Sequence, residues 1–151
     1  YFFYATASTG YPYLPVVLLS VDETLMNRAE AYAELRQNNQ ALKDINDFYS
    51  VRLNSYNPSR DAVTLEKIRA FYSIDDAREG LIRTILDAKK AEFLQEGIRW
   101  IDIARSHLPA GKNLYSPTGE KSFIDLQPND LRRVFQIPEE VKLAGIEQNP
   151  R

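Results

Sequence analysis

The stretch EFLQEGIRWIDIAR, residues 92–105, contains the only tryptophan of this 151-residue chain, Trp100. In an α-helix successive side chains are about 100° apart, so Phe93, Gly97 and Trp100 lie on one face. The apolar surface is widened by Leu94, Ile98, Ile101 and Ala104. Because so broad an apolar surface is typical of a helix packed between neighbours, we expect Trp100 to be largely buried.

Charged side chains of alternating sign follow the rest of the same helix in steps of three residues. They are Glu96, Arg99, Asp102 and Arg105. Neighbours in such a series can form ion pairs worth about 0.2–0.5 kcal/mol each. We therefore interpret these residues as structural, and Gly97 as a point where another backbone approaches closely.

A catalytic interpretation of the same stretch rests on Glu92 and Glu96. Paired carboxylates hydrolyse glycosides when they flank the bond from opposite sides of a cleft. Two carboxylates one turn apart on one helix are poorly placed for that. We expect neither glutamate to be catalytic.

The composition limits the classes of function. Hydrophobic residues make up 44% and charged residues 26%, which indicates a globular domain with a real core. A net charge of −2 argues against nucleic acid as a partner. The chain has no cysteine and one histidine, His107, so thiolate and multi-histidine metal sites are excluded. We expect no metal and no cofactor.

Two amphipathic helices are predicted upstream, as a helix hairpin over about residues 20–54. Ser20-Val-Asp-Glu23 fits a capping box at the start of the first helix. Small and large residues alternate as in a tetratricopeptide repeat, at Ala29, Tyr32, Ala41 and Ile45. One such hairpin cannot bury its outer faces, so it must pack on something else.

The remaining elements follow from local patterns. We predict a short helix over residues 64–72 and one long helix over about residues 77–106. The C-terminal region, 107–151, is predicted to be loops with short strands near residues 122–126 and 132–137, then one helical turn after Pro138. Residues 1–19 are predicted to form turns and a short strand, because glycine and prolines disfavour a helix there.

Three motifs together resemble the SusD-like (RagB/SusD) family of outer-membrane nutrient-binding lipoproteins. The first is the family's hallmark segment, formed here by Glu92, Glu96, Gly97, Arg99, Trp100, Asp102 and Arg105. The second, NRAEAYAEL at residues 27–35, resembles its Ala-Glu-Ala helix, with Glu23 before it. The third, Ile137-Pro138 followed by Gln148-Asn149-Pro150, resembles its C-terminal signature.

The chain departs from the family pattern at three places. Ala88-Lys89-Lys90 stands where Glu-Arg is frequent, and Ile101 stands where an aromatic residue is common. The chain ends in Asn-Pro-Arg in place of Asn-Pro-Gly-Tyr. These differences concern fine specificity more than membership.

The resemblance implies a mainly α fold with tetratricopeptide-like helix pairs, loops and short strands, as a portion of a SusD-like α-α superhelix. It implies a surface-exposed lipoprotein of the bacterial outer membrane that binds glycans or other nutrients without turning them over. The implied partner is a TonB-dependent, SusC-like transporter. It also implies that residues 1–151 are the C-terminal part of the protein, with the lipid anchor upstream.

Aromatic side chains outside the helical core are our candidates for glycan contact, because they can stack on the apolar faces of sugar rings beside polar groups. They are Tyr11, Tyr13, Tyr56, Tyr72 and Tyr115. Two alternatives remain open. The helix pair can act as a tetratricopeptide-like protein-interaction module, and a hydrolase can be built on Glu92 and Glu96.

Overall fold

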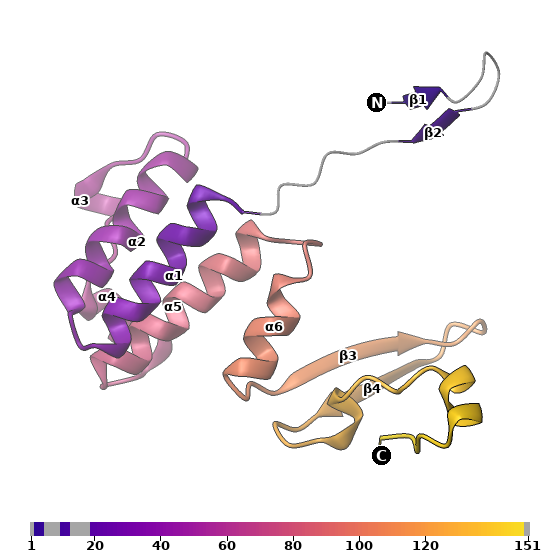
Figure 1. The fold of residues 1–151 in the computed structure, drawn as a ribbon. Coiled ribbons are helices and arrows are strands. Elements are labelled where there is room, and N and C mark those ends of the chain that lie inside the picture. Colours follow the sequence, from indigo (N-terminus) through magenta and orange to yellow (C-terminus); the bar gives the residue numbers. More distant parts are fainter. Residues whose placement is uncertain (1, 5–9, 13–18, 150–151) are drawn as a thin grey trace. The chain divides into compact units, whose positions relative to one another are not determined.

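The computed structural model describes the backbone of residues 2–4 and 10–12 and the whole of residues 19–149. These residues are mainly helical, as the sequence predicts (Figure 1). The chain divides into two compact units, Tyr1–Lys89 and Lys90–Arg151. Among the described residues, no helix is both long and apolar enough to cross a bilayer.

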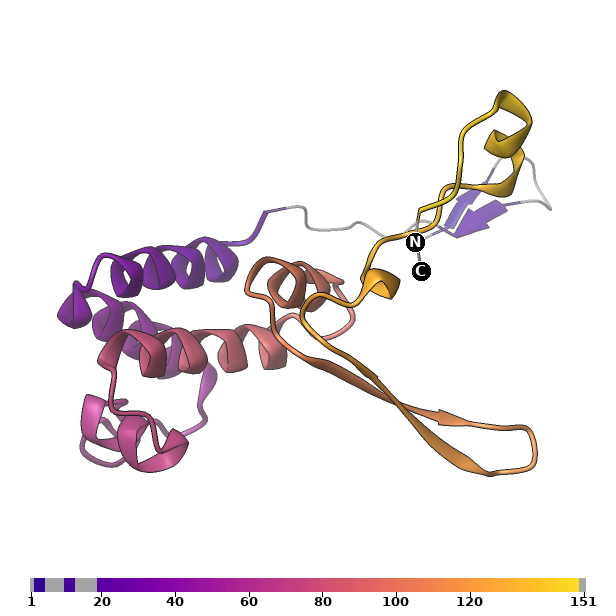
Figure 2. The same cartoon turned by 90° about the horizontal axis from the view of Figure 1, so that it is seen from below.

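The first unit contains the predicted helix hairpin, formed by α1 (Val21–Glu34) and α2 (Asn38–Arg52) (Figures 1 and 2). Ser20 caps α1, because its Oγ accepts a hydrogen bond of 3.0 Å from the backbone N–H of Glu23. Ala29, Ala41 and Ile45 are completely buried, which confirms the repeat-like packing expected of these positions.

Three further helices complete the first unit. They are α3 (Pro58–Asp61), α4 (Leu65–Tyr72) and α5 (Ala77–Glu92), whose last turn passes into the second unit. The α4 helix confirms the short helix predicted for residues 64–72. A Cβ on Gly80 would lie 2.6 Å from Cγ2 of Ile68, so this glycine lets α5 approach α4 closely.

The core of the first unit draws on four of these helices. Its buried members are Met26, Ala29, Ala33, Ala41, Ile45, Phe48, Ile68, Leu81, Ile85 and Ala88. Two polar links join the helices around it. Arg28 of α1 donates two hydrogen bonds of 2.8 Å to the carboxylate of Asp44 of α2. Lys89, itself 4% exposed, donates a bond of 3.1 Å to Oδ1 of Asn27.

The prediction of one long helix over residues 77–106 is wrong. The α5 helix ends at Glu92, and a separate helix, α6, spans Ile98–Arg105. Between them Gln95 and Gly97 have φ values of +71° and +81°. Residues in this left-handed region cannot continue a right-handed helix. The glycine that we interpreted as a close approach between backbones is therefore a helix boundary.

The second unit contains α6 and an antiparallel ribbon of β3 (Ala110–Tyr115) and β4 (Lys121–Leu126). The β4 strand confirms the strand predicted near residues 122–126, whereas β3 was not predicted. The turn between them includes Gly119, whose φ is +84°.

In the last part of the second unit, one predicted strand is absent and one predicted helical turn is present. The strand predicted near residues 132–137 is wrong, because a 3-10 turn, η1 (Leu131–Arg133), begins there. Asp130 caps this turn by accepting a bond of 2.9 Å from the backbone N–H of Arg132. The helical turn expected after Pro138 is present as η2 (Glu139–Ala144).

The described backbone before residue 19 forms two strands where the sequence predicted one. Strands β1 (Phe2–Tyr4) and β2 (Gly10–Pro12) pair antiparallel, with Phe3 opposite Tyr11. Residues 2–4 therefore have a strand partner in residues 10–12.

Candidate functional site

Tyr72 is placed for a structural role. Its hydroxyl donates a hydrogen bond of 2.8 Å to Oδ2 of Asp87, and its side chain packs against the core of the first unit. Partial burial, together with the carboxylate of Asp87, raises the pKa of Tyr72 to about 12. The rings of Tyr72 and Phe71 pack edge to face, with their centroids 4.8 Å apart. A sugar would have to compete with these contacts.

Tyr56 also has an internal neighbour. It is half-buried, and its hydroxyl lies 3.5 Å from Oδ1 of Asn46. The Asn46 amide joins α2 to the following loop, since Oδ1 accepts from the backbone N–H of Val63 and Nδ2 donates to the carbonyl of the same residue. Tyr56 therefore borders a structural network.

Two of the candidate tyrosines lie at the start of the chain. Tyr11 is in β2, where the structure describes the backbone alone, and Tyr13 lies outside the described residues. Glycan contact by either residue stays a prediction.

Tyr115 lies on an exposed aromatic face of the β3–β4 ribbon. It ends β3 opposite Lys121, while Asn113 on the same face pairs with Phe123. Tyr115 is 68% and Phe123 63% exposed, which leaves both rings open to solvent. Phe123 was not among the predicted contact residues, although the alternation of side chains around it is the signal of a strand with two different faces.

Polar groups adjoin these rings on the same face. A Cβ on Gly111 would lie 2.3 Å from Cζ of Phe123, so the phenyl ring covers this glycine. Asp125 is paired with Gly111, and Asn113 is paired with Phe123. An aromatic surface with an amide and a carboxylate beside it can stack on a sugar ring and bind its hydroxyl groups. We call Asn113, Tyr115, Phe123 and Asp125 the aromatic face of the ribbon.

The opposite face of the ribbon borders a hollow of about 560 Å³ within the second unit. Leu114, Ile124 and Leu126 line it from the strands, and Trp100 and Ile103 from α6. Lys112 and Arg132 also border it. Arg132 is engaged with the carboxylate of Asp130, and these hydrogen bonds lower the pKa of Asp130 to about 2.

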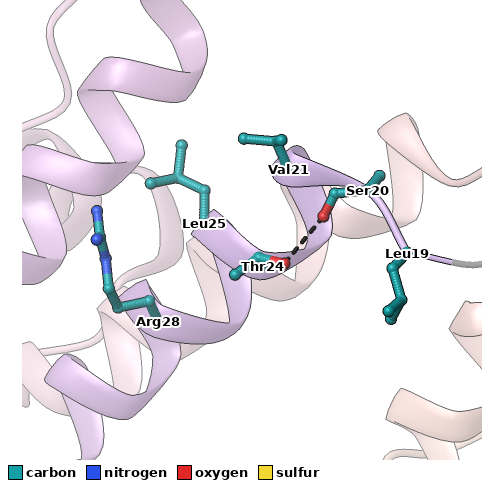
Figure 3. A pocket seen from close by; sticks show the side chains of 6 residues that line it. All are labelled: Leu19, Ser20, Val21, Thr24, Leu25 and Arg28. Carbon is teal, nitrogen blue, oxygen red and sulfur yellow. Dashed lines mark hydrogen bonds between the residues drawn. The ribbon is translucent and has the colours of Figure 1, made fainter.

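A second, shallower hollow of about 340 Å³ opens at the start of α1 (Figure 3). Its polar groups already have partners. Thr24 donates a bond of 3.0 Å to the carbonyl of Ser20, and Arg28 is paired with Asp44. The strongly exposed side chains here are the apolar Leu19 and Val21. This hollow therefore offers few free groups to a sugar.

The hallmark segment is less buried than its apolar pattern predicts. Trp100 is partly buried, whereas Leu94 is 74% and Ile101 63% exposed, so the expectation that the whole apolar surface packs between neighbours is wrong for these two residues. Asp102 is 2% exposed and accepts a bond of 2.8 Å from Arg105. This is one of the ion pairs that the charge spacing predicts, and it links two of the motif residues within α6.

The two candidate catalytic glutamates are not on one helix. Glu92 is the last residue of α5, and Glu96 lies exposed in the segment before α6. The prediction that both glutamates lie on one helix is therefore wrong. Among the described residues, no group of three or more histidines and carboxylates is arranged to hold a metal ion.

The two halves of the C-terminal motif bind each other. Gln148 donates a hydrogen bond of 2.6 Å to the carbonyl of Ile137, and Asn149 donates one of 2.7 Å to the carbonyl of Phe135. In the opposite direction, the side-chain amide of Gln136 donates a hydrogen bond of 3.2 Å to the carbonyl of Asn149. These side-chain amides therefore fix the chain after η2 against the segment before it.

Comparison with known protein families gave a match. The profile of the SusD family matches residues 19–143 and thus includes the helix hairpin, the hallmark segment and the ribbon. The chain belongs to the SusD family. Searches among characterised proteins and among solved structures gave no match.

Membership of the SusD family gives the broad class of function. SusD family proteins are in general non-catalytic proteins for binding nutrients, glycans above all, at the bacterial outer membrane. They generally work with SusC-like transporters. The mainly helical structure agrees with the SusD assignment.

Proposed function

We propose that this chain contributes to non-catalytic capture of glycans at the outer membrane, and that the aromatic face of the ribbon contacts the sugar. The observation that carries this is the pair of open rings, Tyr115 and Phe123, on one face of two paired strands. Membership of the SusD family supports the ligand class. The partner in delivery would be a TonB-dependent, SusC-like transporter.

The same proposal includes further parts of the protein that pack on this chain and hold it at the cell surface. We infer that further helix pairs pack on the first unit, because Leu35, Val51 and Phe71 are 68%, 71% and 79% exposed there. A tetratricopeptide-like pair needs such neighbours to cover its apolar surface. A lipid anchor in an upstream part of the protein would hold these units at the cell surface.

The test compares exposed aromatic residues on and off the ribbon. We expect Tyr115→Ala combined with Phe123→Ala to weaken glycan binding roughly tenfold, equivalent to about 1.4 kcal/mol. Phe135→Ala is the matched control, since Phe135 is 81% exposed and outside the ribbon. Calorimetry on a glycan panel, with circular dichroism to confirm folding, gives the readout. Equal affinities of the double variant and the control would reject the aromatic face as the site.

A protein-interaction module is the second candidate function. The exposed apolar residues of the first unit support it, because helix pairs of this kind also bind partner chains. Co-purification with a transporter tests whether the helix pair binds a partner independently of glycan binding. If Val51→Asp abolishes transporter binding and leaves glycan affinity unchanged, the helix pair has a docking role of its own. If transporter binding persists in this variant, the module interpretation of that surface fails.

A further inference from the structure

The two faces of the β3–β4 ribbon differ in chemistry. Side chains alternate between the faces of a strand, and directly paired residues share a face. Lys112 with Ile124, and Ala110 with Leu126, therefore lie opposite the aromatic face. This second face borders the hollow that also receives Trp100 and Ile103 from α6.

The size of the hollow suits a small molecule. Its volume of about 560 Å³ lies within the range of roughly 300–1,000 Å³ that small-molecule sites occupy. Most of the lining side chains are aliphatic or aromatic, and Leu114 and Ile124 are each 36% exposed. A ligand with an apolar body would remove this surface from water, which is favourable.

The charged side chains at the hollow determine which ligand charge is favoured. Arg132 is engaged by the carboxylate of Asp130 through Nε at 2.8 Å, so this pair is close to neutral. Lys112 instead stands opposite the apolar Ile124. Its aliphatic stem can lie along the apolar wall while its ammonium group stays at the rim. The local field at the rim therefore favours one negative charge.

We propose that the hollow between α6 and the ribbon binds a small amphiphilic carboxylate, with its apolar chain against Trp100 and its carboxylate near Lys112. This site is separate from the aromatic face and does not depend on glycan binding. Because the chain has one tryptophan, the fluorescence of Trp100 reports on the hollow directly.

Octanoate is a suitable probe, and octanol is its uncharged counterpart. We expect a saturable change in Trp100 fluorescence with octanoate and several-fold weaker binding of octanol. Lys112→Met should lower the affinity for octanoate about two- to fivefold, as for an exposed ion pair. It should leave octanol binding unchanged, because methionine keeps the apolar stem.

Lys121→Met is the matched control, since Lys121 is an exposed lysine of the same ribbon paired with Tyr115 on the other face. It should leave the octanoate affinity unchanged. Leu114→Asp should abolish the fluorescence response to both probes, with circular dichroism confirming the fold. The proposal is rejected if octanoate gives no saturable signal. It is also rejected if Lys112→Met and Lys121→Met have the same effect on octanoate.

Discussion

Gly97 is the N-cap residue directly before α6 and has a φ of +81°, and a Cβ there would meet no atom within 4 Å. The glycine is therefore required for its backbone conformation and not for space. We expect Gly97→Ala to lower the free energy of unfolding by roughly 1–2 kcal/mol, the cost of the left-handed region. Gly97→Asn should cost less, because asparagine tolerates this region. Urea denaturation gives both values, and equal costs would contradict the backbone explanation.

Gly80 is the contrasting residue. A Cβ there would lie 2.6 Å from Cγ2 of Ile68, so Gly80→Ala should cost about 1–3 kcal/mol through overpacking. In a double-mutant cycle, Ile68→Ala should offset part of this cost, because it removes the clashing methyl group. Strict additivity of the two changes would show that space is not the reason for this glycine.

Tyr72 gives a pH dependence with a defined sign. Its pKa of about 12 in the folded chain exceeds the ordinary value of 10.0, because burial and Asp87 favour the neutral phenol. The unfolded chain therefore loses this proton first as the pH rises. We expect the stabilisation to be complete below pH 10 and to be lost between about pH 10 and pH 12. Tyr72→Phe should flatten this part of the curve of unfolding free energy against pH, and an unchanged curve would refute the assignment.

At the scale of elements, Arg133 joins α6 to the ribbon. Its guanidinium donates to four backbone carbonyls, those of Ile103, Leu108, Leu126 and Gln127. Ile103 lies in the last turn of α6 and Leu108 follows that helix, while Leu126 ends β4 and Gln127 follows it. Carbonyls at a helix end lack partners within the helix, so a cation there is stabilising. One side chain thus fixes the distance between the two walls of the hollow.

We expect Arg133→Met to destabilise the second unit by about 2 kcal/mol, because hydrogen bonds to charged groups contribute about that much. Arg132→Met is the control, since Arg132 is half exposed and pairs with its neighbour Asp130. Its loss should cost less than about 1 kcal/mol. Hydrogen exchange of the β3 and β4 amides measures the difference. Equal exchange rates in the two variants would contradict a joining role for Arg133.

At the scale of the whole molecule, the buried side chains are unevenly distributed. Every member of the main core cluster comes from residues 26–88, within the first unit. Among the described residues of the second unit, Phe93 and Asp102 are the buried side chains. Regions with few buried apolar contacts open more readily. The second unit should therefore be the less stable one.

Hydrogen exchange followed by mass spectrometry tests this difference. We expect amides of α1, α2 and α5 to exchange at least roughly tenfold more slowly than those of β3 and β4, which corresponds to about 1.4 kcal/mol. Simultaneous exchange of both units in one cooperative step would contradict the prediction. A glycan that binds the ribbon should slow exchange in β3 and β4 and leave α1 and α2 unchanged.

Local sequence alone determined the first unit well. Ser20 marks the start of α1 as its cap. The small residues Ala29 and Ala41 let α1 and α2 pack closely, and the apolar periodicity continues to Ile85 in α5. These signals act over a few residues, so they are readable without knowledge of the fold. The three motifs likewise indicated the family, because they depend on residue identity and order.

The aromatic face and the hollow were decided by tertiary structure. Tyr115 and Phe123 share a face only because β3 pairs with β4 in one register, with Asn113 opposite Phe123. A shift by one residue would move every side chain to the other face. The helix break had a different origin. An apolar period continues through Gly97 at the level of sequence, but the positive φ values at Gln95 and Gly97 end α5 and turn the chain into α6. Strand register depends on pairing between residues far apart in the sequence, and the break before α6 determines which helix carries Trp100 to the hollow beside the ribbon.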